Sequence, residues 1–326
     1  MTKRERVVNA ILGKEVDGIP SSFSLHFPEA QAVGDAAVEA HLKFFEETDT
    51  DIIKIMNENL LPAPAEGYIR TPEEYYNQVP EITEKTTFIT DQIEMTKKIL
   101  DRADKDAFSL GTLHGVCATG IHPLMNMGEG FTVEEARQIQ LDFLRWDEKK
   151  MLDAMERITE GMCILAKAYV DAGVDAVYYA ALGAERKWFT DEEFDKWIKP
   201  FDLRIMKAIK DAGGYCFLHM CKYGLNMGRY DKDYAALSDV VNWGVYEAPM
   251  SLEEGRNQFA GITVCGGLKN RTGVLVDGDE AAVRAEVRDV IQGFGRKGFI
   301  LGADCTMNTE QDLSLVRAAV EEARNH

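Results

Sequence analysis

The chain has 326 residues and a mass of 36.5 kDa, and its 37 lysines and arginines against 55 aspartates and glutamates give a net charge of −18. This acidic balance argues against general binding to DNA or RNA backbones, which requires a basic surface. Apolar residues make up 45% of the chain and charged residues 28%, which is typical of a folded globular protein and not of a disordered one.

The amino-terminal segment MTKRERVVNAILGKEVDG has the pattern of an amphipathic helix and lacks the apolar run of a signal peptide. One uncharged stretch, Ala107 to Gly128, is long enough to be a membrane candidate, but its four glycines, one proline and two histidines would break or polarise a spanning helix. We interpret it as a buried strand followed by a pocket-lining loop. Six cysteines in a chain without an export signal indicate reduced thiols and a cytoplasmic location.

Short β-like runs alternate with longer helical stretches along the whole chain. The strand candidates are Ile19–Leu25, Asp51–Met56, Ala107–Leu113, Ala176–Ala180, Tyr215–Leu218, Val240–Val245, Ile262–Cys265 and Gly298–Gly302. The helical stretches include Thr132–Ala172, Asp191–Gly213 and Asp279–Gly293. Thr132 and Thr190 are each followed by acidic residues, as at capped helix starts. No linker, repeat or low-complexity segment divides the sequence, so we expect one domain over residues 1–326.

Eight strand–helix units over about 300 residues predict an α/β fold, a single (β/α)₈ TIM barrel with an amino-terminal helical extension. The competing fold is a doubly wound open sheet, which is disfavoured because no G-x-G-x-x-G motif follows the first strand. In a barrel, the chemistry lies where the strands end at the carboxyl face. This rule selects His26, Asn57, Glu58, His114, Tyr178, Tyr179, His219, Cys221, Asn242, Lys269 and Cys305.

The strongest local pattern is His219-Met220-Cys221 at the end of the fifth predicted strand. Residues i and i+2 of an extended chain point the same way, so the imidazole and the thiolate can reach one metal ion, and Cys305 offers a third ligand. Three protein ligands with an open position are typical of catalytic zinc. Ordinary burial is the alternative, because cysteine is among the most buried residue types. The remaining cysteines are interpreted as small core residues: Cys117, Cys163, Cys216 and Cys265.

Several segments are similar to those of a known family. They are Lys3–Val7 followed by Gly13–Pro20 at the start of the chain, and Phe194–Pro200 followed by Ile209–Gly213 before the fifth strand. These segments resemble the uroporphyrinogen decarboxylase superfamily, and the resemblance extends along nearly the whole chain.

Two branches of this superfamily differ at the pocket. The decarboxylases bring an arginine-rich segment after the first strand and an aspartate after the second, for a substrate with eight carboxylates. Here the first strand runs into Ser24–Glu29 without an arginine, and Asn57 or Glu58 stands in place of the aspartate. Without cations, binding an octacarboxylate would cost more free energy than it gained. Decarboxylation of such a tetrapyrrole is therefore kept as the less favoured alternative.

The other branch is the cobamide-dependent methyltransferases, whose zinc motif is His-x-Cys with a distant Cys, and His219, Cys221 and Cys305 match it. The resemblance implies Zn²⁺ and a methyl group that moves between a small substrate and a corrinoid (methylcobalamin) on a separate partner protein. The small substrate is either a thiol acceptor or a methoxy or methylamino donor. No clear acidic fourth ligand follows the sixth strand; Glu247, water or the substrate itself are the candidates.

The other pocket residues are assigned roles by their position. We expect catalytic roles for His114, Asn57, Glu58 and Tyr178, and substrate-binding roles for His26, His122, Tyr179 and Arg186. Only one of the two adjacent tyrosines can face the barrel interior, so core packing is the alternative for the other. For each histidine the alternative is a structural hydrogen bond, and for Arg186 a solvated loop charge. A non-catalytic module that binds a tetrapyrrole or a partner protein remains the third class of function.

Overall fold

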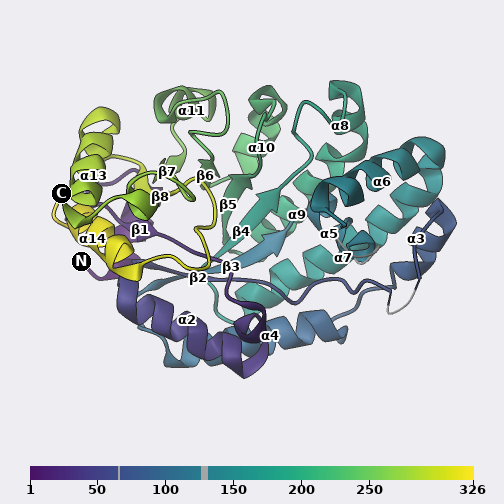
Figure 1. The fold of residues 1–326 in the computed structure, drawn as a ribbon, viewed down its shortest axis with the longest axis horizontal. Coiled ribbons are helices and arrows are strands. Elements are labelled where there is room, and N and C mark those ends of the chain that lie inside the picture. Colours follow the sequence, from purple (N-terminus) through teal and green to yellow (C-terminus); the bar gives the residue numbers. More distant parts are fainter. Residues whose placement is uncertain (65–66, 126–130) are drawn as a thin grey trace.

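The computed structural model describes residues 1–64, 67–125 and 131–326 and contains eight parallel strands in one nearly closed sheet (Figure 1). The strands are β1 (Ser21–Ser22), β2 (Ile52–Ile55), β3 (Phe108–His114), β4 (Ala176–Ala181), β5 (Tyr215–Met220), β6 (Val240–Trp243), β7 (Thr263–Leu268) and β8 (Phe299–Ala303). They follow the order β1-β8-β7-β6-β5-β4-β3-β2. The predicted (β/α)₈ TIM barrel is confirmed, and each of the eight predicted strands overlaps an observed one.

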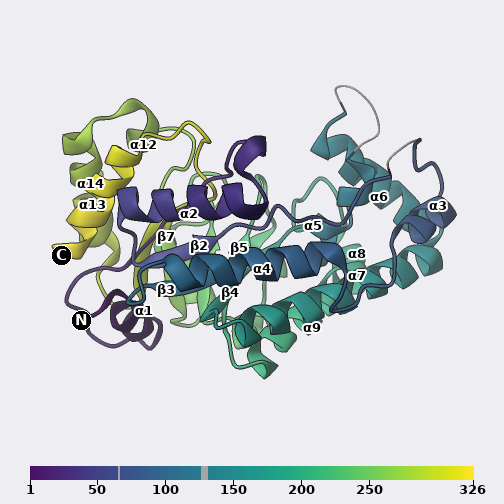
Figure 2. The same ribbon diagram turned by 90° about the horizontal axis from the view of Figure 1, so that it is seen from below.

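Helices surround this barrel, and Figure 2 shows α2 and α4 lying side by side along one flank. The α-helices are α1 (Lys3–Ile11), α2 (Gly34–Thr48), α3 (Pro72–Gln78), α4 (Thr87–Arg102), α5 (Val116–Thr119), α6 (Val133–Trp146), α7 (Glu148–Asp171), α8 (Asp191–Trp197), α9 (Lys199–Asp211), α10 (Lys232–Leu237), α11 (Leu252–Gln258), α12 (Val274–Asp277), α13 (Glu280–Phe294) and α14 (Leu313–Arg324). Single 3₁₀ turns are η1 (Glu29–Gln31), η2 (His122–Leu124) and η3 (Met227–Arg229). No helix in the described ranges is long and apolar enough to span a membrane.

Two of the predicted helical stretches are each divided in two. Asp147 ends α6 and also caps α7, because its side chain accepts a hydrogen bond from the backbone N–H of Lys150. The stretch from Asp191 breaks at Ile198, where Pro200 in the first turn of α9 lacks the N–H that a continuous helix would need. The two predicted helix starts are confirmed as capping boxes. The loop interpretation of the uncharged stretch includes residues 126–128, which lie outside the described residues.

The first predicted strand, Ile19–Leu25, is mostly not a strand. Only Ser21 and Ser22 pair with β8, and the chain returns to a single bridge at Leu25. Pro20 cannot donate a ladder hydrogen bond, which limits the strand at its start. Between β1 and β2 no ladder is described; instead the Asp51 carboxylate accepts hydrogen bonds from the Ser21 backbone N–H at 3.1 Å and its hydroxyl at 2.8 Å. A carboxylate therefore joins the two edges of the sheet.

The amino end of the barrel is filled and closed. Inward-facing side chains such as Ile52, Phe108 and Phe217 pack into one cluster with Val7 and Ala10 of α1. Because α1 contacts β2, β3 and β8 at this end, a substrate can approach the barrel interior only from the carboxyl ends of its strands. The fold thus directs the functional residues to one face.

Candidate metal centre

Strand β5 positions two of the three predicted metal ligands, one within it and one directly after it. Phe217 points into the barrel, so His219, two residues further, also points inward and is only 2% exposed. The strand is two residues longer than predicted, so His219 lies within it and Cys221 directly after it. Cys305 follows β8 and is brought to the same place by the closure of the sheet.

The donor atoms of these three side chains all lie within 4.8 Å of one another. The Sγ atoms of Cys221 and Cys305 are 3.8 Å apart, and Cys305 Sγ is 3.4 Å from His219 Nε2. Tetrahedral zinc with Zn–S bonds of about 2.3 Å separates two sulfur ligands by about 3.8 Å, and a sulfur from a nitrogen by about 3.6 Å. Both cysteines are free thiols, and their sulfurs are too far apart for a disulfide. The donor set and its spacing therefore fit Zn²⁺.

The charge at this centre is already concentrated on one sulfur. The Cys221 thiol shares its proton with Cys305 and so holds the pKa of Cys305 well below its usual value, with further contributions from His219 and Lys54. The same hydrogen bond raises the pKa of Cys221. A thiolate is the form that binds metal, so Cys305 is prepared as a ligand before any ion arrives.

Tyr178 fixes the ring of His219. The two rings stack with centroids 5.0 Å apart and an interplanar angle of 23°. The Tyr178 hydroxyl donates to Asn242 Oδ1 at 2.8 Å, and the Asn242 amide donates to the carbonyls of Cys265 and Ala303 at 2.9 and 3.2 Å. His219 Nδ1 is buried and has no hydrogen-bond partner in the described part of the chain. The imidazole is thus oriented by stacking, with Nε2 directed at the cysteines.

The loop after β6 is held beside the centre by Asp304, which sequence reasoning missed. Its carboxylate accepts the backbone N–H groups of Val245 and Tyr246, each at 3.1 Å, and burial raises the pKa of Asp304 to about 7. This arrangement brings Glu247 close enough for the charges of Cys305 and His219 to act on it. Burial also raises the pKa of Glu247. An acidic residue immediately before the distant cysteine was the available signal for Asp304.

A second group of predicted residues lies at the ends of the first three strands. His26 Nδ1 is hydrogen bonded to the Glu58 carboxylate, and the ring of His114 meets the ring of His122 edge-on at 5.4 Å. Burial lowers the pKa of His114 to about 4, although the charge of Glu58 opposes this shift. Burial likewise lowers the pKa of His122 to about 3. Both rings are therefore neutral at physiological pH, while His26 and Glu58 are joined by a hydrogen bond.

Three other predicted residues lie elsewhere. Tyr179 points away from the barrel interior, and its hydroxyl donates to Asp202 of α9. Arg186 is exposed, and its side chain makes no hydrogen bond or ion pair within the described ranges. Asn57 is buried, and its side-chain oxygen accepts the backbone N–H of Asn59 at 3.1 Å. The structure therefore brings neither Tyr179 nor Arg186 to the metal ligands.

Lys54 on β2 was not selected by sequence reasoning, yet it lies inside the barrel beneath the centre. Its side chain is 5% exposed, and its Nζ is 3.3 Å from the centroid of the Tyr178 ring. The sequence signal that could have identified Lys54 was its place within the apolar run Ile52–Met56, two residues from the inward-facing Ile52.

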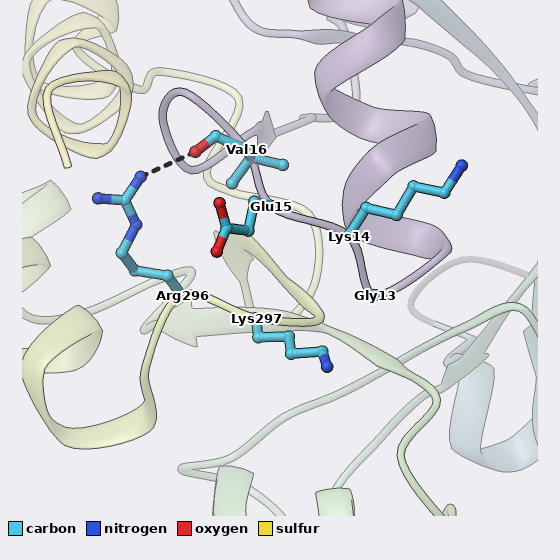
Figure 3. A pocket seen from close by; sticks show the side chains of 6 residues that line it. All are labelled: Gly13, Lys14, Glu15, Val16, Arg296 and Lys297. Atoms are coloured by element: carbon cyan, nitrogen blue, oxygen red, sulfur yellow. Dashed lines mark hydrogen bonds between the residues drawn. The ribbon is translucent and has the colours of Figure 1, made fainter.

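A separate cavity of about 510 Å³ lies at the amino ends of β1 and β8 (Figure 3). There the Arg296 guanidinium donates to the Val16 carbonyl at 3.0 Å, and the side chains of Lys14 and Lys297 extend away from it. This end of a barrel does not carry the chemistry, so we place no substrate in this cavity.

Comparisons with known proteins agree with this fold. A methyltransferase from Methanosarcina mazei matches with a TM-score of 0.76 and 16% identity, covering 99% of this chain and 98% of that one. A B12-independent methionine synthase from a Shewanella species, in complex with selenomethionine, has a TM-score of 0.59 and 12% identity over 94% and 97% of the two chains. A putative B12-independent methionine synthase from Listeria monocytogenes has a TM-score of 0.56 and 14% identity over 88% and 84%. The search of curated proteins found no match.

The sequence itself matches the profile of the uroporphyrinogen decarboxylase (URO-D) family over residues 2–326. The chain belongs to the uroporphyrinogen decarboxylase family.

Proposed function

We propose that this family member is a zinc-dependent methyltransferase that moves a methyl group between a corrinoid on a partner protein and a small substrate. The observation that carries the proposal is the spacing of His219, Cys221 and Cys305: all three donor atoms lie within 4.8 Å of one another, and the two separations from Cys305 Sγ, 3.8 and 3.4 Å, are close to those of a tetrahedral zinc site. The structures similar in fold include a methyltransferase and methionine synthases, which agrees with methyl-transfer chemistry.

In this proposal His219, Cys221 and Cys305 hold Zn²⁺ and leave one position for the substrate or Glu247. Bound zinc would supply Lewis acidity, which activates a thiol acceptor or polarises the heteroatom of a methoxy or methylamino donor. Tyr178 keeps the imidazole in place through its stacked ring.

The pair formed by His26 and Glu58 is suited to move the proton of the substrate heteroatom. Glu58 occupies Nδ1 of the imidazole and so leaves Nε2 to give or take a proton. His26 remains half exposed, which gives this proton a route to solvent. His114 and His122, which are neutral, would line the same side of the mouth.

The alternative tetrapyrrole decarboxylase lacks support at the first strand. Ser24–Glu29 contains no arginine, and the imidazole of His26 is already hydrogen bonded to the Glu58 carboxylate. An octacarboxylate would need several cations there. We therefore prefer methyl transfer.

Metal analysis tests the proposed site. We expect about one zinc ion per chain in the purified protein, and loss of that zinc in Cys221→Ser and in Cys305→Ser, because a three-ligand site rarely survives the loss of a ligand. Cys163→Ser is the matched control, since Cys163 lies on α7 away from the centre and should leave the zinc content unchanged. A metal-free wild-type protein that still binds a tetrapyrrole would favour a non-catalytic binding module.

An activity assay tests the reaction. The zinc-loaded protein is mixed with methylcobalamin and a panel of thiols, and separately with reduced cobalamin and methoxy or methylamino compounds. Cobalamin absorbance shows which compound gains or gives a methyl group. Release of carbon dioxide from uroporphyrinogen would contradict the proposal outright.

A further inference from the structure

Lys54 is a buried cation, and no anionic side chain in the described part of the chain forms an ion pair with it. It stands two residues after Ile52 on β2, on the inward-facing side of the strand, and its Nζ lies over the Tyr178 ring at 3.3 Å. The ring of Tyr178 also stacks on His219, and β4 lies between β2 and β5 in the sheet. One aromatic side chain therefore connects the ammonium to a metal ligand. Within the described ranges Lys54 forms no ion pair and no hydrogen bond.

Five titratable groups on different strands interact with Lys54. They are His114 at the end of β3, Tyr178 on β4, Cys221 after β5, Cys265 on β7 and Cys305 after β8. Burial raises the pKa of Cys265 to about 12 and that of the Tyr178 phenol well above its usual value, so both stay protonated. His114 is neutral at physiological pH. The Cys305 thiolate of the centre is therefore the negative charge that Lys54 faces.

Burial lowers the pKa of Lys54 to about 8, so most of the side chain is still charged at neutral pH. A buried charge without compensation is costly, and a protein keeps one where an opposite charge is close. A divalent metal ion held by two thiolates and a neutral imidazole carries no net charge. With Lys54 beneath it, the loaded centre has one positive charge in excess, which a single further anion would balance.

We infer that Lys54 is a positioning residue that compensates the charge of an anionic fourth ligand at the centre: the thiolate of the substrate or, without substrate, the carboxylate of Glu247. This inference rests on the proposed function and deepens it, because a neutral ether oxygen or amine would leave the excess charge unbalanced. The preferred small substrate is therefore a thiol. On binding, the S–H bond of the thiol breaks, its proton passes to solvent, and the sulfur donates an electron pair to the centre, so no oxidant or reductant is needed.

Cobalt-substituted protein provides the test, because thiolate binding to cobalt is visible as a charge-transfer absorption band. The probe is 2-mercaptoethanol, titrated at several pH values into the wild type and Lys54→Met. We expect Lys54→Met to hold one metal ion per chain, to bind the thiol about tenfold more weakly at pH 7, and to shift the pH midpoint of thiolate binding upward by about one unit. The sign follows because loss of a nearby positive charge makes the thiolate harder to form.

Lys210→Met is the matched control. Lys210 also approaches a tyrosine ring, that of Tyr215, but it pairs with Asp239 at the opposite end of β5, so its loss should leave both the midpoint and the affinity unchanged. Lys54→Gln repeats the comparison with a polar neutral side chain if the methionine variant does not fold.

The outcomes separate the two proposals. A metal-loaded Lys54→Met or Lys54→Gln protein with wild-type midpoint and affinity would overturn the role of Lys54 and leave the zinc centre standing. A wild-type protein that binds no metal would remove the proposed function, and the inference with it. Equal shifts in the Lys210→Met control would show that the effect is not specific to the cation beneath the centre.

Discussion

Asp202 is a carboxylic acid that is fully buried on α9. Its carboxyl oxygens accept the hydroxyls of Tyr179 and Tyr234, the latter at 2.9 Å, and no ion pair of Asp202 is found in the ranges that the structure describes. Burial raises the pKa of Asp202 to about 7, although both hydroxyls oppose the shift. A side chain that sequence reasoning assigned to the substrate, Tyr179, is thus used to satisfy a buried acid.

This acid predicts a measurable dependence of stability on pH. Between about pH 4 and pH 7 the folded protein keeps a proton on Asp202 that the unfolded chain has lost, so this group makes the protein less stable as the pH rises. In Asp202→Asn the free energy of unfolding should therefore rise more steeply with pH, by up to about 1.4 kcal/mol per pH unit relative to the wild type. Urea unfolding at pH 4.5 to 7.5 measures both slopes.

The buried histidines have the opposite effect on the pH dependence of stability, and they are present in both the wild type and Asp202→Asn. Burial lowers the pKa values of His41 and His114 to about 4, so the unfolded chain takes up protons below about pH 6.5 that the folded protein does not. Their contribution to the slope of stability against pH is therefore the same in the wild type and in Asp202→Asn, and it cancels when the two slopes are compared. Asp195→Asn, on the exposed side of α8, is the control, and an Asp202→Asn slope equal to that of the wild type would refute the assignment.

At the scale of elements, Gly255 of α11 packs against the ring of Trp243 on β6. Trp243 is fully buried, and its indole N–H donates to the Met250 carbonyl at 3.0 Å, just before the helix. A Cβ atom at Gly255 would lie 2.0 Å from the Trp243 ring, a distance no side chain can occupy. The helix can approach the strand this closely only because residue 255 has no side chain.

Two glycine-to-alanine substitutions should therefore have opposite effects. Gly255→Ala must push α11 away from Trp243, and we expect it to lower the free energy of unfolding by about 1–3 kcal/mol. Gly293→Ala, within α13, has no atom within 4 Å of the added methyl group and should raise it by about 0.5–1 kcal/mol through better helix propensity. Chemical denaturation compares the pair, and equal effects would show that the contact with Trp243 does not limit α11.

The elements show which features a sequence can predict. The strands from β2 to β8 were found from apolar runs, because a barrel strand is buried on both faces. The break at Asp147 was missed because helix-favouring residues continue through it, and the break at Ile198 was missed although Pro200 marks it. The short β1 depends on pairing with β8, which no local pattern reports.

The site was predictable to a similar degree. The three metal ligands were selected by the strand-end rule and by the family resemblance, and the structure brings them together. The direction of Tyr179 and the burial of Lys54 depend on which face of a strand points inward. For a strand that is apolar on both faces, the sequence does not alternate between apolar and polar residues, so it does not show which face points inward.

At the scale of the whole molecule, α1 closes the amino end of the barrel with a buried ion pair. Arg6 on α1 is 6% exposed and reaches the fully buried Asp51 and, at 2.7 Å, Asp17. Asp51 in turn receives both hydrogen bonds of Ser21. One cation therefore ties the first helix to the two edges of the sheet.

Removal of this cation should destabilise the whole fold. Arg6→Met leaves the buried Asp51 with its hydrogen bonds from Ser21 and with Arg324 at 3.6 Å, so we expect a loss of about 3 kcal/mol in the free energy of unfolding. The zinc content per folded chain should not change, because the centre lies at the other end of the barrel. Lys98→Met, which removes an exposed ion pair with Asp35, is the control and should have little effect. A comparable loss in the control would refute the special role of Arg6.

The join between β1 and β2 has a consequence for motion. Seven of the eight junctions in the ring are continuous ladders, whereas this one consists of side-chain bonds to Asp51. Breaking it needs no strand to unpair, so transient opening of the ring should begin there. In hydrogen–deuterium exchange, the amide of Ser21 should lose protection before those of β4 and β5, which are paired on both sides. The barrel would then open along the junction between β1 and β2, which lies across the ring from β5 and Cys221.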